Sequence, residues 1–175
     1  MSIVTDSLLC ENRYAHDEDE FINAWDEFQV LSNYIGIMNI RYNDKFIPDF
    51  DVDDRFMDYK IPRMLLQPII ENVIVHGYRN YQQDCKIDIT GRLVDNHLEI
   101  IIRDYGEGIP TSKLHDMQMK LSEDGTYPSG INHIALLNID CRIKSYYGKN
   151  TGISIVSSTE NGTIITMKLG NSFSV

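Results

Sequence analysis

The chain has 175 residues, of which 42% are hydrophobic and 24% are charged, a composition typical of a globular protein with one full core. A formal net charge of −10 argues against a nucleic-acid surface, which would need a clustered basic face. No apolar run approaches the length of a membrane span, and the first residues lack the basic and apolar parts of a signal peptide. We therefore expect a cytoplasmic domain, which can be one piece of a larger membrane protein.

A long helix is predicted over residues 18–42. An acidic cluster at 17–20 suits a helix N-terminus, and apolar residues then recur at alternating gaps of three and four. These residues are Phe21, Ala24, Phe28, Leu31, Ile35, Met38 and Tyr42. Such a heptad seam has two interpretations: the helix packs on its own domain, or it pairs with another helix, for example across a dimer. The pattern alone leaves both open.

The next segments carry a strand signal and two helix signals. Residues 49–54 alternate apolar and acidic side chains, as a half-exposed strand does. Helices are expected to begin at Pro62 and at Pro68, because proline suits the first helical position. The second helix is predicted to run over about 68–78, with an apolar face of Ile69, Ile70, Val73 and Ile74.

Two polar side chains of that helix are candidate ligand-binding residues. Asn72 and His76 are four residues apart, so they share a face beside the apolar one and can meet one ligand. An amide oxygen facing a cleft can bind Mg²⁺. Gly77 is expected to end the helix.

A carboxylate is predicted to lie inside the domain at the end of a strand. Strands are expected near 85–90 and 97–104, and period two places Asp104 on the inward face of the second. A buried carboxylate is costly unless something donates hydrogen bonds to it, which makes Asp104 a candidate to bind a ligand amine. Gly106 and Gly108 follow and would let the backbone approach a flat ligand or its phosphates. The alternative is an aspartate that caps a turn.

The remaining chain predicts two helices and a closing pair of strands. The helices are expected at 111–122 and 131–147, with a turn-rich loop at 123–130 between them. Strands follow at about 152–158 and 163–169, with Thr163 pointing inward. The order of elements predicts an α+β two-layer sandwich, a mixed sheet with helices on one face.

Three stretches together resemble the sensor histidine kinases of the LytS/YesM class. They are Leu-Gln-Pro-Ile-Ile-Glu-Asn-Val-Ile-Val-His-Gly at 66–77, Asp-Tyr-Gly-Glu-Gly-Ile-Pro at 104–110, and 133–148 with its Asn, Arg and Tyr-Gly. The resemblance covers roughly 18–170 and implies a Bergerat-type ATP-binding fold. It divides the chain into an N-terminal segment with the long helix, 1–43, at the end of a dimerisation region, and a catalytic domain, 44–175.

The same resemblance implies roles for individual residues. Asp104 would recognise the adenine amine, Asn72 would ligate Mg²⁺ between the phosphates, and Thr163 would add a water-mediated adenine contact. The implied nucleotide-binding set is Asn72, His76, Asp104, Gly106, Gly108, Ile109, Gly130 and Thr163. In this set Gly130 is the hinge of an ATP lid at 123–130.

The resemblance also implies a transfer reaction rather than hydrolysis. Relatives that hydrolyse ATP carry a glutamate one helical turn before the Mg²⁺ asparagine, where this chain has Pro68. No general base is therefore expected, and Glu71 is kept as the only candidate for a catalytic residue. The γ-phosphate would pass to a histidine outside this chain, since His16 lacks the motif around an acceptor.

Three departures from the family pattern keep a second function open. Val75 stands where many histidine kinases carry a phosphate-contacting lysine, and His133 and Ala135 replace usual glycines. We expect a histidine kinase of a two-component signalling system that uses ATP and Mg²⁺, with its own dimerisation and acceptor helices and, indirectly, a response regulator as partners. The alternative is a stand-alone anti-sigma-type kinase or a degenerate ATP-binding module used for protein interaction.

Overall fold

The computed structural model describes residues 20–56, 58–78, 84–95, 97–122 and 134–170. The strands are β1 (Phe21–Asn23), β2 (Phe46–Val52), β3 (Lys60–Pro62), β4 (Cys85–Val94), β5 (His97–Asp104), β6 (Gly152–Ser158) and β7 (Gly162–Gly170). The helices are α1 (Ala24–Tyr42), the short 3₁₀ turn Asp54–Phe56, α2 (Gln67–Asn72) with its π-helical continuation Val73–Gly77, α3 (Thr111–Ser122) and α4 (Ile134–Tyr147). None of these helices is long and apolar enough to cross a membrane.

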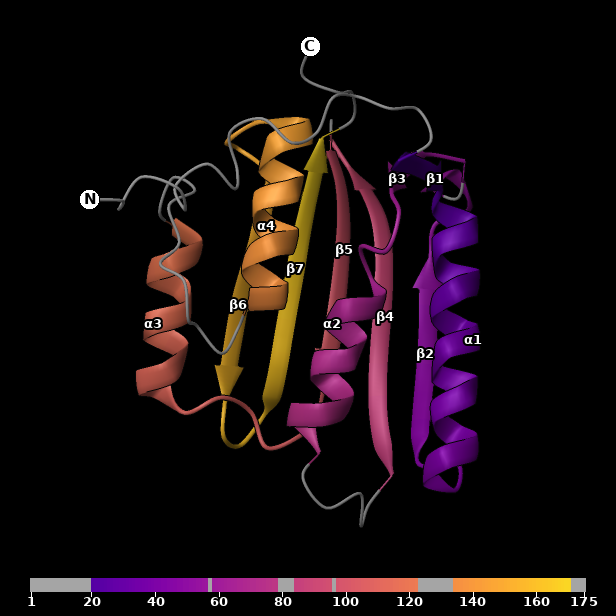
Figure 1. The fold of residues 1–175 in the computed structure, drawn as a ribbon, viewed down its shortest axis with the longest axis vertical. Helices are drawn as coiled ribbons and strands as arrows, with labels where there is room; N and C mark the ends of the chain where they lie inside the picture. The colour runs from indigo at the N-terminus through magenta and orange to yellow at the C-terminus, as the bar shows by residue number, and fades with distance from the viewer. Residues whose placement is uncertain (1–19, 57, 79–83, 96, 123–133, 171–175) are drawn as a thin grey trace, which may run out of the picture.

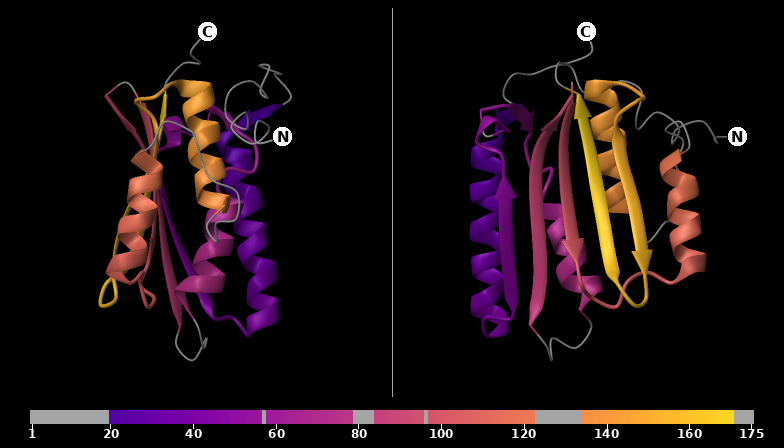
Figure 2. Two further views of the ribbon diagram at one scale, coloured as in Figure 1. Left: turned by 60° about the vertical axis from the view of Figure 1, so that its left-hand side comes forward. Right: turned by 180° about the vertical axis from the view of Figure 1, so that it is seen from behind.

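The domain has two layers. Five strands form one sheet in the order β2-β4-β5-β7-β6, in which β2 and β4 are parallel and every other pair is antiparallel. Helices α1, α2 and α4 cover one face, and α3 lies beside β6 at the edge (Figure 1). Seen from behind, the opposite face carries no helix in the described part of the chain (Figure 2). The predicted α+β sandwich with a mixed sheet is confirmed.

Alternation along the strands builds the core. In β5, Leu98, Ile100 and Ile102 point toward the helices and are at most 1% exposed, while the residues between them are half-buried on the other face. Each such fully buried side chain stabilises the fold by about 1.5–3 kcal/mol. Ile69 and Ile70 of α2 join the same cluster from the helix layer.

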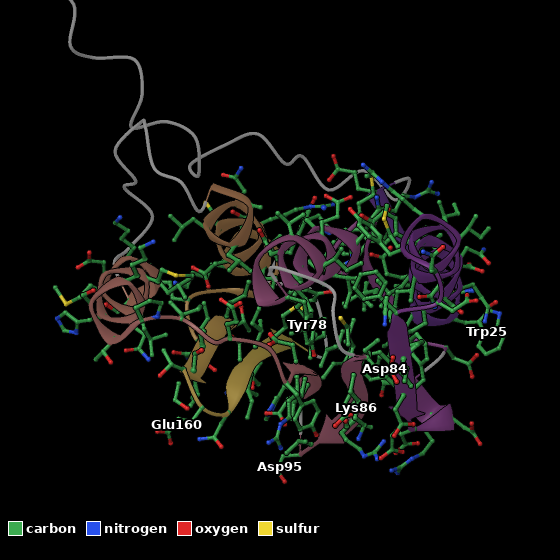
Figure 3. The ribbon with its side chains drawn as sticks, turned by 90° about the horizontal axis from the view of Figure 1, so that it is seen from below. Trp25, Tyr78, Asp84, Lys86, Asp95 and Glu160 are labelled. Atoms are coloured by element: carbon green, nitrogen blue, oxygen red, sulfur yellow. The ribbon has the colours of Figure 1, made fainter. Side chains whose placement is uncertain are left out.

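The long helix packs on its own domain. Five residues of the predicted heptad seam are buried in the common core: Phe21, Ala24, Phe28, Leu31 and Ile35. The first interpretation of the seam therefore holds for these residues. On the outer side of α1, Trp25 points away from the domain (Figure 3).

Three element boundaries in the N-terminal half were predicted wrongly. The helix begins at Ala24 rather than at 18, because Phe21–Asn23 extends and pairs with Lys60–Pro62 as a two-stranded antiparallel sheet. Pro62 consequently ends a strand instead of starting a helix. The strand predicted at 49–54 lies earlier, at Phe46–Val52, because the chain then turns into the short 3₁₀ segment.

The later elements agree closely with the prediction. Helix α2 begins one residue before Pro68, and its π-helical continuation ends at Gly77. Helix α3 spans the predicted 111–122, and α4 is described from Ile134. A side chain of α3 also reaches the edge strand, where Gln118 donates from Nε2 to the carbonyl of Ile155 at 2.9 Å.

Candidate functional site

A cavity of about 170 Å³ lies between α2, α3 and α4 and the helix-covered face of the sheet. Its lining is mostly apolar, with a few polar groups at defined places, which is the usual character of a small-molecule site. The lining residues are Asn72, Val73, Val75, Gly77, Asp104, Gly108, Ile109, Pro110, Lys113, Met117, Leu136, Thr163 and Ile165.

Asp104 is the carboxylate at the inner end of this cavity. The register between β5 and β7 places it opposite Thr163, and its side chain is 3% exposed. Its Oδ1 accepts the N–H of Gly106 at 2.9 Å. Burial raises the pKa of Asp104, and hydrogen bonds from Gly106 and Thr163 oppose that rise. The predicted inward position of Asp104 is confirmed, and its bond to Gly106 also agrees with the alternative, an aspartate that caps a turn.

The turn after Asp104 rests directly on the end of the α2 helical run. The N–H of Glu107 donates to the carbonyl of Gly77 at 2.9 Å. A Cβ added at Gly106 would lie 1.9 Å from that same carbonyl oxygen, so only glycine fits there. Close contact between two segments of protein backbone therefore requires glycine at this position.

The second glycine of the turn fits against the β6–β7 hairpin. Gly108 has a φ of +65°, and an added Cβ would lie 1.9 Å from the carbonyl oxygen of Ser158. The N–H of Ile109 donates to Ser157 Oγ at 2.8 Å, and that hydroxyl lies 3.0 Å from Thr163 Oγ1. The turn, the hairpin and the inward threonine thus form one hydrogen-bonded wall of the cavity.

Asn72 brings an amide to the opposite side of the cavity. Its Nδ2 donates to the carbonyl of Pro68 at 3.0 Å, which fixes the side chain and leaves Oδ1 outside that bond. The neighbouring Glu71 accepts from Gln67 Nε2 at 2.9 Å and is not among the residues that line the cavity. Glu71 is therefore not placed as a free general base beside the cavity.

A tyrosine ties the end of α2 to the sheet. The hydroxyl of Tyr78 donates to the carbonyl of Lys86 at 2.7 Å and accepts the N–H of Tyr105 at 3.0 Å. Tyr78 lies between the helix layer and the sheet (Figure 3). Burial raises its pKa to about 12, so the hydroxyl stays protonated and keeps both bonds at neutral pH.

The structure brings together most, but not all, of the predicted site residues. One cavity is lined by Asn72, Asp104, Gly108, Ile109 and Thr163. Gly106 does not line it but packs against the backbone of Gly77, which does. Gly130, the loop at 123–130 and His133 lie outside the described residues, as does the side chain of His76.

Several lining residues were missed by sequence reasoning. Lys113 stands in the first turn of α3 and adds the one cation among the described lining residues. Met117 and Leu136 supply apolar contact from α3 and α4. A lysine three residues after the turn motif was the available signal for Lys113. Val75, which replaces a family lysine, lines the cavity and is 59% exposed.

Comparison with known proteins identifies a family. The sequence profile described as "Histidine kinase-, DNA gyrase B-, and HSP90-like ATPase" matches residues 57–172. Sensor histidine kinase/phosphatase LytS of Staphylococcus aureus is 30% identical over 138 residues, which are 78% of this chain and 23% of that protein. The chain thus spans about a quarter of the length of this curated relative.

Solved structures share the fold at low sequence identity. The Acinetobacter baumannii histidine kinase AdeS has a TM-score of 0.63 at 16% identity, covering 94% of this chain and 72% of that one. The nucleotide-free catalytic domain of histidine kinase ThkA has a TM-score of 0.60 at 16% identity, covering 87% and 95%. A complex of ThkA with response regulator protein TrrA gives a TM-score of 0.57 at 13% identity, covering 87% and 41%. The chain belongs to the histidine kinase-, DNA gyrase B- and HSP90-like ATPase family and is an ATP-binding domain of it.

Proposed function

We propose that this chain is the catalytic domain of a sensor histidine kinase, which binds Mg·ATP in the cavity and donates the γ-phosphate to a histidine outside the chain. The observation that carries the proposal is Asp104, a buried carboxylate at the inner end of an apolar slot. A group placed there is costly to fold unless a ligand donor completes its hydrogen bonds.

The slot suits a purine. Asp104 would accept from the exocyclic amine of adenine, and the hydroxyl of Thr163 beside it can bind a bridging water. Val73, Met117 and Ile165 offer apolar surface to a flat ring. These contacts together would select the base and exclude water from it.

The donor set at the cavity mouth fits a phosphate-bound Mg²⁺. This ion keeps several waters and usually takes one or two protein oxygens in addition to phosphate oxygens. Asn72 can supply one such oxygen, because its nitrogen is engaged by Pro68. Bound Mg²⁺ would neutralise phosphate charge, and Lys113 would add a second positive charge from α3.

The placement of Glu71 and Pro68 favours transfer over hydrolysis. Glu71 is held by Gln67, and Pro68 occupies the turn before Asn72. Phosphoryl transfer depends mainly on positioning and charge neutralisation, so a pocket of this kind can work without a base of its own.

The wider assignments rest on the resemblance of the sequence to sensor histidine kinases. We infer that residues 1–43 end a dimerisation region, that 44–175 form the catalytic domain, and that the parent protein is anchored in the membrane. The acceptor helices of the parent and a response regulator would be its partners, and the N-terminal helix would contribute to a homodimer. Similarity to the sensor histidine kinase/phosphatase LytS supports a kinase parent, and the complex of ThkA with response regulator protein TrrA supports a response regulator as partner.

Calorimetric titration tests the proposal. Adenosine and Mg·ADP should both bind the chain, and Mg·ADP should bind more tightly because Asn72 and Lys113 act only on the phosphates. ATP incubated with the chain should release phosphate slowly. A chain that shows no heat with either ligand at about 1 mM would contradict the assignment, because even a weak specific site registers there.

A further inference from the structure

A buried glutamate of α1 holds the loop from which α2 begins. Glu27 Oε1 accepts the N–H of Leu65 at 2.7 Å and of Leu66 at 2.9 Å. Its Oε2 accepts the N–H of Met64 at 3.0 Å. Three successive backbone donors therefore converge on one carboxylate that lies 37 to 39 residues earlier in the chain.

The buried charge of this carboxylate is stabilised by the backbone N–H groups of the loop. Glu27 is 2% exposed, and none of the ion pairs formed within the described residues includes it. A buried charge without a cation costs several kcal/mol, which charge-assisted hydrogen bonds to backbone N–H groups can offset. The carboxylate also lies at the start of a helical run, where negative charge is favoured.

The loop is strained and is fixed from two sides. Met64 has a φ of +54°, a left-handed conformation that costs a non-glycine residue about 1–3 kcal/mol. On the carbonyl side, Arg142 of α4 donates from Nη1 to the carbonyl of Arg63 at 2.6 Å. Glu27 thus holds the N–H side of a loop whose carbonyl side is held by another helix.

The helical run carries this constraint to the cavity. The carbonyl of Leu66 accepts the first helical N–H groups, those of Ile69 and Ile70, at 3.1 Å each. Asn72 follows six residues after Leu66, less than two helical turns away. The far end of the run is held separately, by the bond from Glu107 to Gly77. A loosened loop would therefore tilt the turn that carries Asn72 relative to Asp104.

We propose that Glu27 is a positioning residue of the nucleotide site: through the loop at 63–66 it sets the place of Asn72, and so the affinity for metal-bound phosphates. The inference rests on the proposed function. It assigns α1 an indirect effect on the phosphate side of the cavity, through the loop and Asn72, that is larger than its effect on the adenine side, where the same helical run contributes Val73.

The test compares Glu27→Gln with Asp26→Asn, each titrated with adenosine and with Mg·ADP. Gln keeps the shape of Glu27 but presents a donor to one of the loop N–H groups. Asp26 is the neighbouring exposed carboxylate of the same helix, so its variant controls for loss of charge. Glu27→Gln should weaken Mg·ADP binding about tenfold, the equivalent of one hydrogen bond to a charged group, and leave adenosine within about twofold. Asp26→Asn should change neither.

Two results of this comparison would overturn the inference about Glu27. Equal loss for both ligands would show a general loosening of the fold, and no loss for either would show that the loop holds its place unaided; both overturn the inference. If Glu27→Gln does not fold, Glu27→Asp takes its place, because it keeps the charge and shortens the reach, and a smaller loss confined to Mg·ADP is expected. Failure of the unaltered chain to bind either ligand would instead overturn the proposed function.

Discussion

Replacing Asp104 by asparagine should weaken nucleotide binding without lowering the free energy of unfolding. Asparagine can keep its Oδ1 as the acceptor for Gly106, and its amino group then takes the place of the second carboxylate oxygen, the one proposed to accept from the ligand. That amino group would face the exocyclic amine of adenine, and two hydrogen-bond donors cannot bond to each other. Loss of a charge-assisted hydrogen bond costs about 2–3 kcal/mol, which weakens nucleotide binding roughly 30- to 150-fold.

The same substitution should not destabilise the fold. Burial raises the pKa of Asp104 above its ordinary value of 3.8, so the native state holds the proton more tightly than the unfolded chain. The resulting penalty on stability is absent below pH 3.8, grows as the pH rises through the raised pKa, and is constant above it. Asparagine carries no charge and avoids this penalty. At pH 7 the unfolding free energy of Asp104→Asn should equal or exceed that of the native chain, and the difference should vanish in acid.

Calorimetry with Mg·ADP and urea unfolding at several pH values measure both effects. Asp140→Asn is the matched control, because this buried carboxylate pairs with Lys144 at 2.7 Å and accepts the N–H of Ile153 at 2.7 Å. Its substitution should lower the unfolding free energy by about 3 kcal/mol. The reasoning about Asp104 is refuted if Asp104→Asn binds nucleotide as tightly as the native chain, or if it unfolds at a lower urea concentration at pH 7.

Three further substitutions test other parts of the site. Lys113→Met should weaken Mg·ADP binding roughly two- to fivefold, less so at high salt, and leave adenosine unchanged in calorimetry; an equal loss for adenosine would argue against a phosphate contact. Gly106→Ala places a Cβ 1.9 Å from the carbonyl of Gly77, so thermal unfolding should show a loss of about 1–3 kcal/mol together with weaker adenosine binding, and a neutral result would contradict the close approach. Tyr78→Phe removes a hydroxyl that donates to a β4 carbonyl at 2.7 Å and accepts the N–H of Tyr105 at 3.0 Å; urea unfolding should register about 1–2 kcal/mol, and an unchanged midpoint would show that these bonds contribute nothing.

Local periodicity was enough to predict the centre of the site. Alternation in β5 placed Asp104 inside, and helical spacing placed Asn72 beside an apolar face, because both patterns depend only on neighbours in sequence. The confirmed position of Thr163 follows from the same rule in β7.

Long-range contacts account for what was missed. The pairing of Phe21–Asn23 with Lys60–Pro62 joins three-residue strands far apart in the chain, and no local pattern distinguishes them from a helix end. The role of Glu27 depends on a loop 37 to 39 residues away, although its position between Ala24 and Leu31 on the buried face was a readable signal. A charged residue in an apolar stripe warrants a search for distant donors.

The two outer strands of the sheet make the domain a poor template for strand addition. At the β6 edge, α3 packs alongside, and Gln118 occupies the carbonyl of Ile155. At the β2 edge, Pro48 has no N–H to offer, and Asp49 places a negative charge on the exposed strand. Edge-to-edge pairing of sheets is thereby disfavoured at both edges, and a protein partner would bind to helices and loops instead.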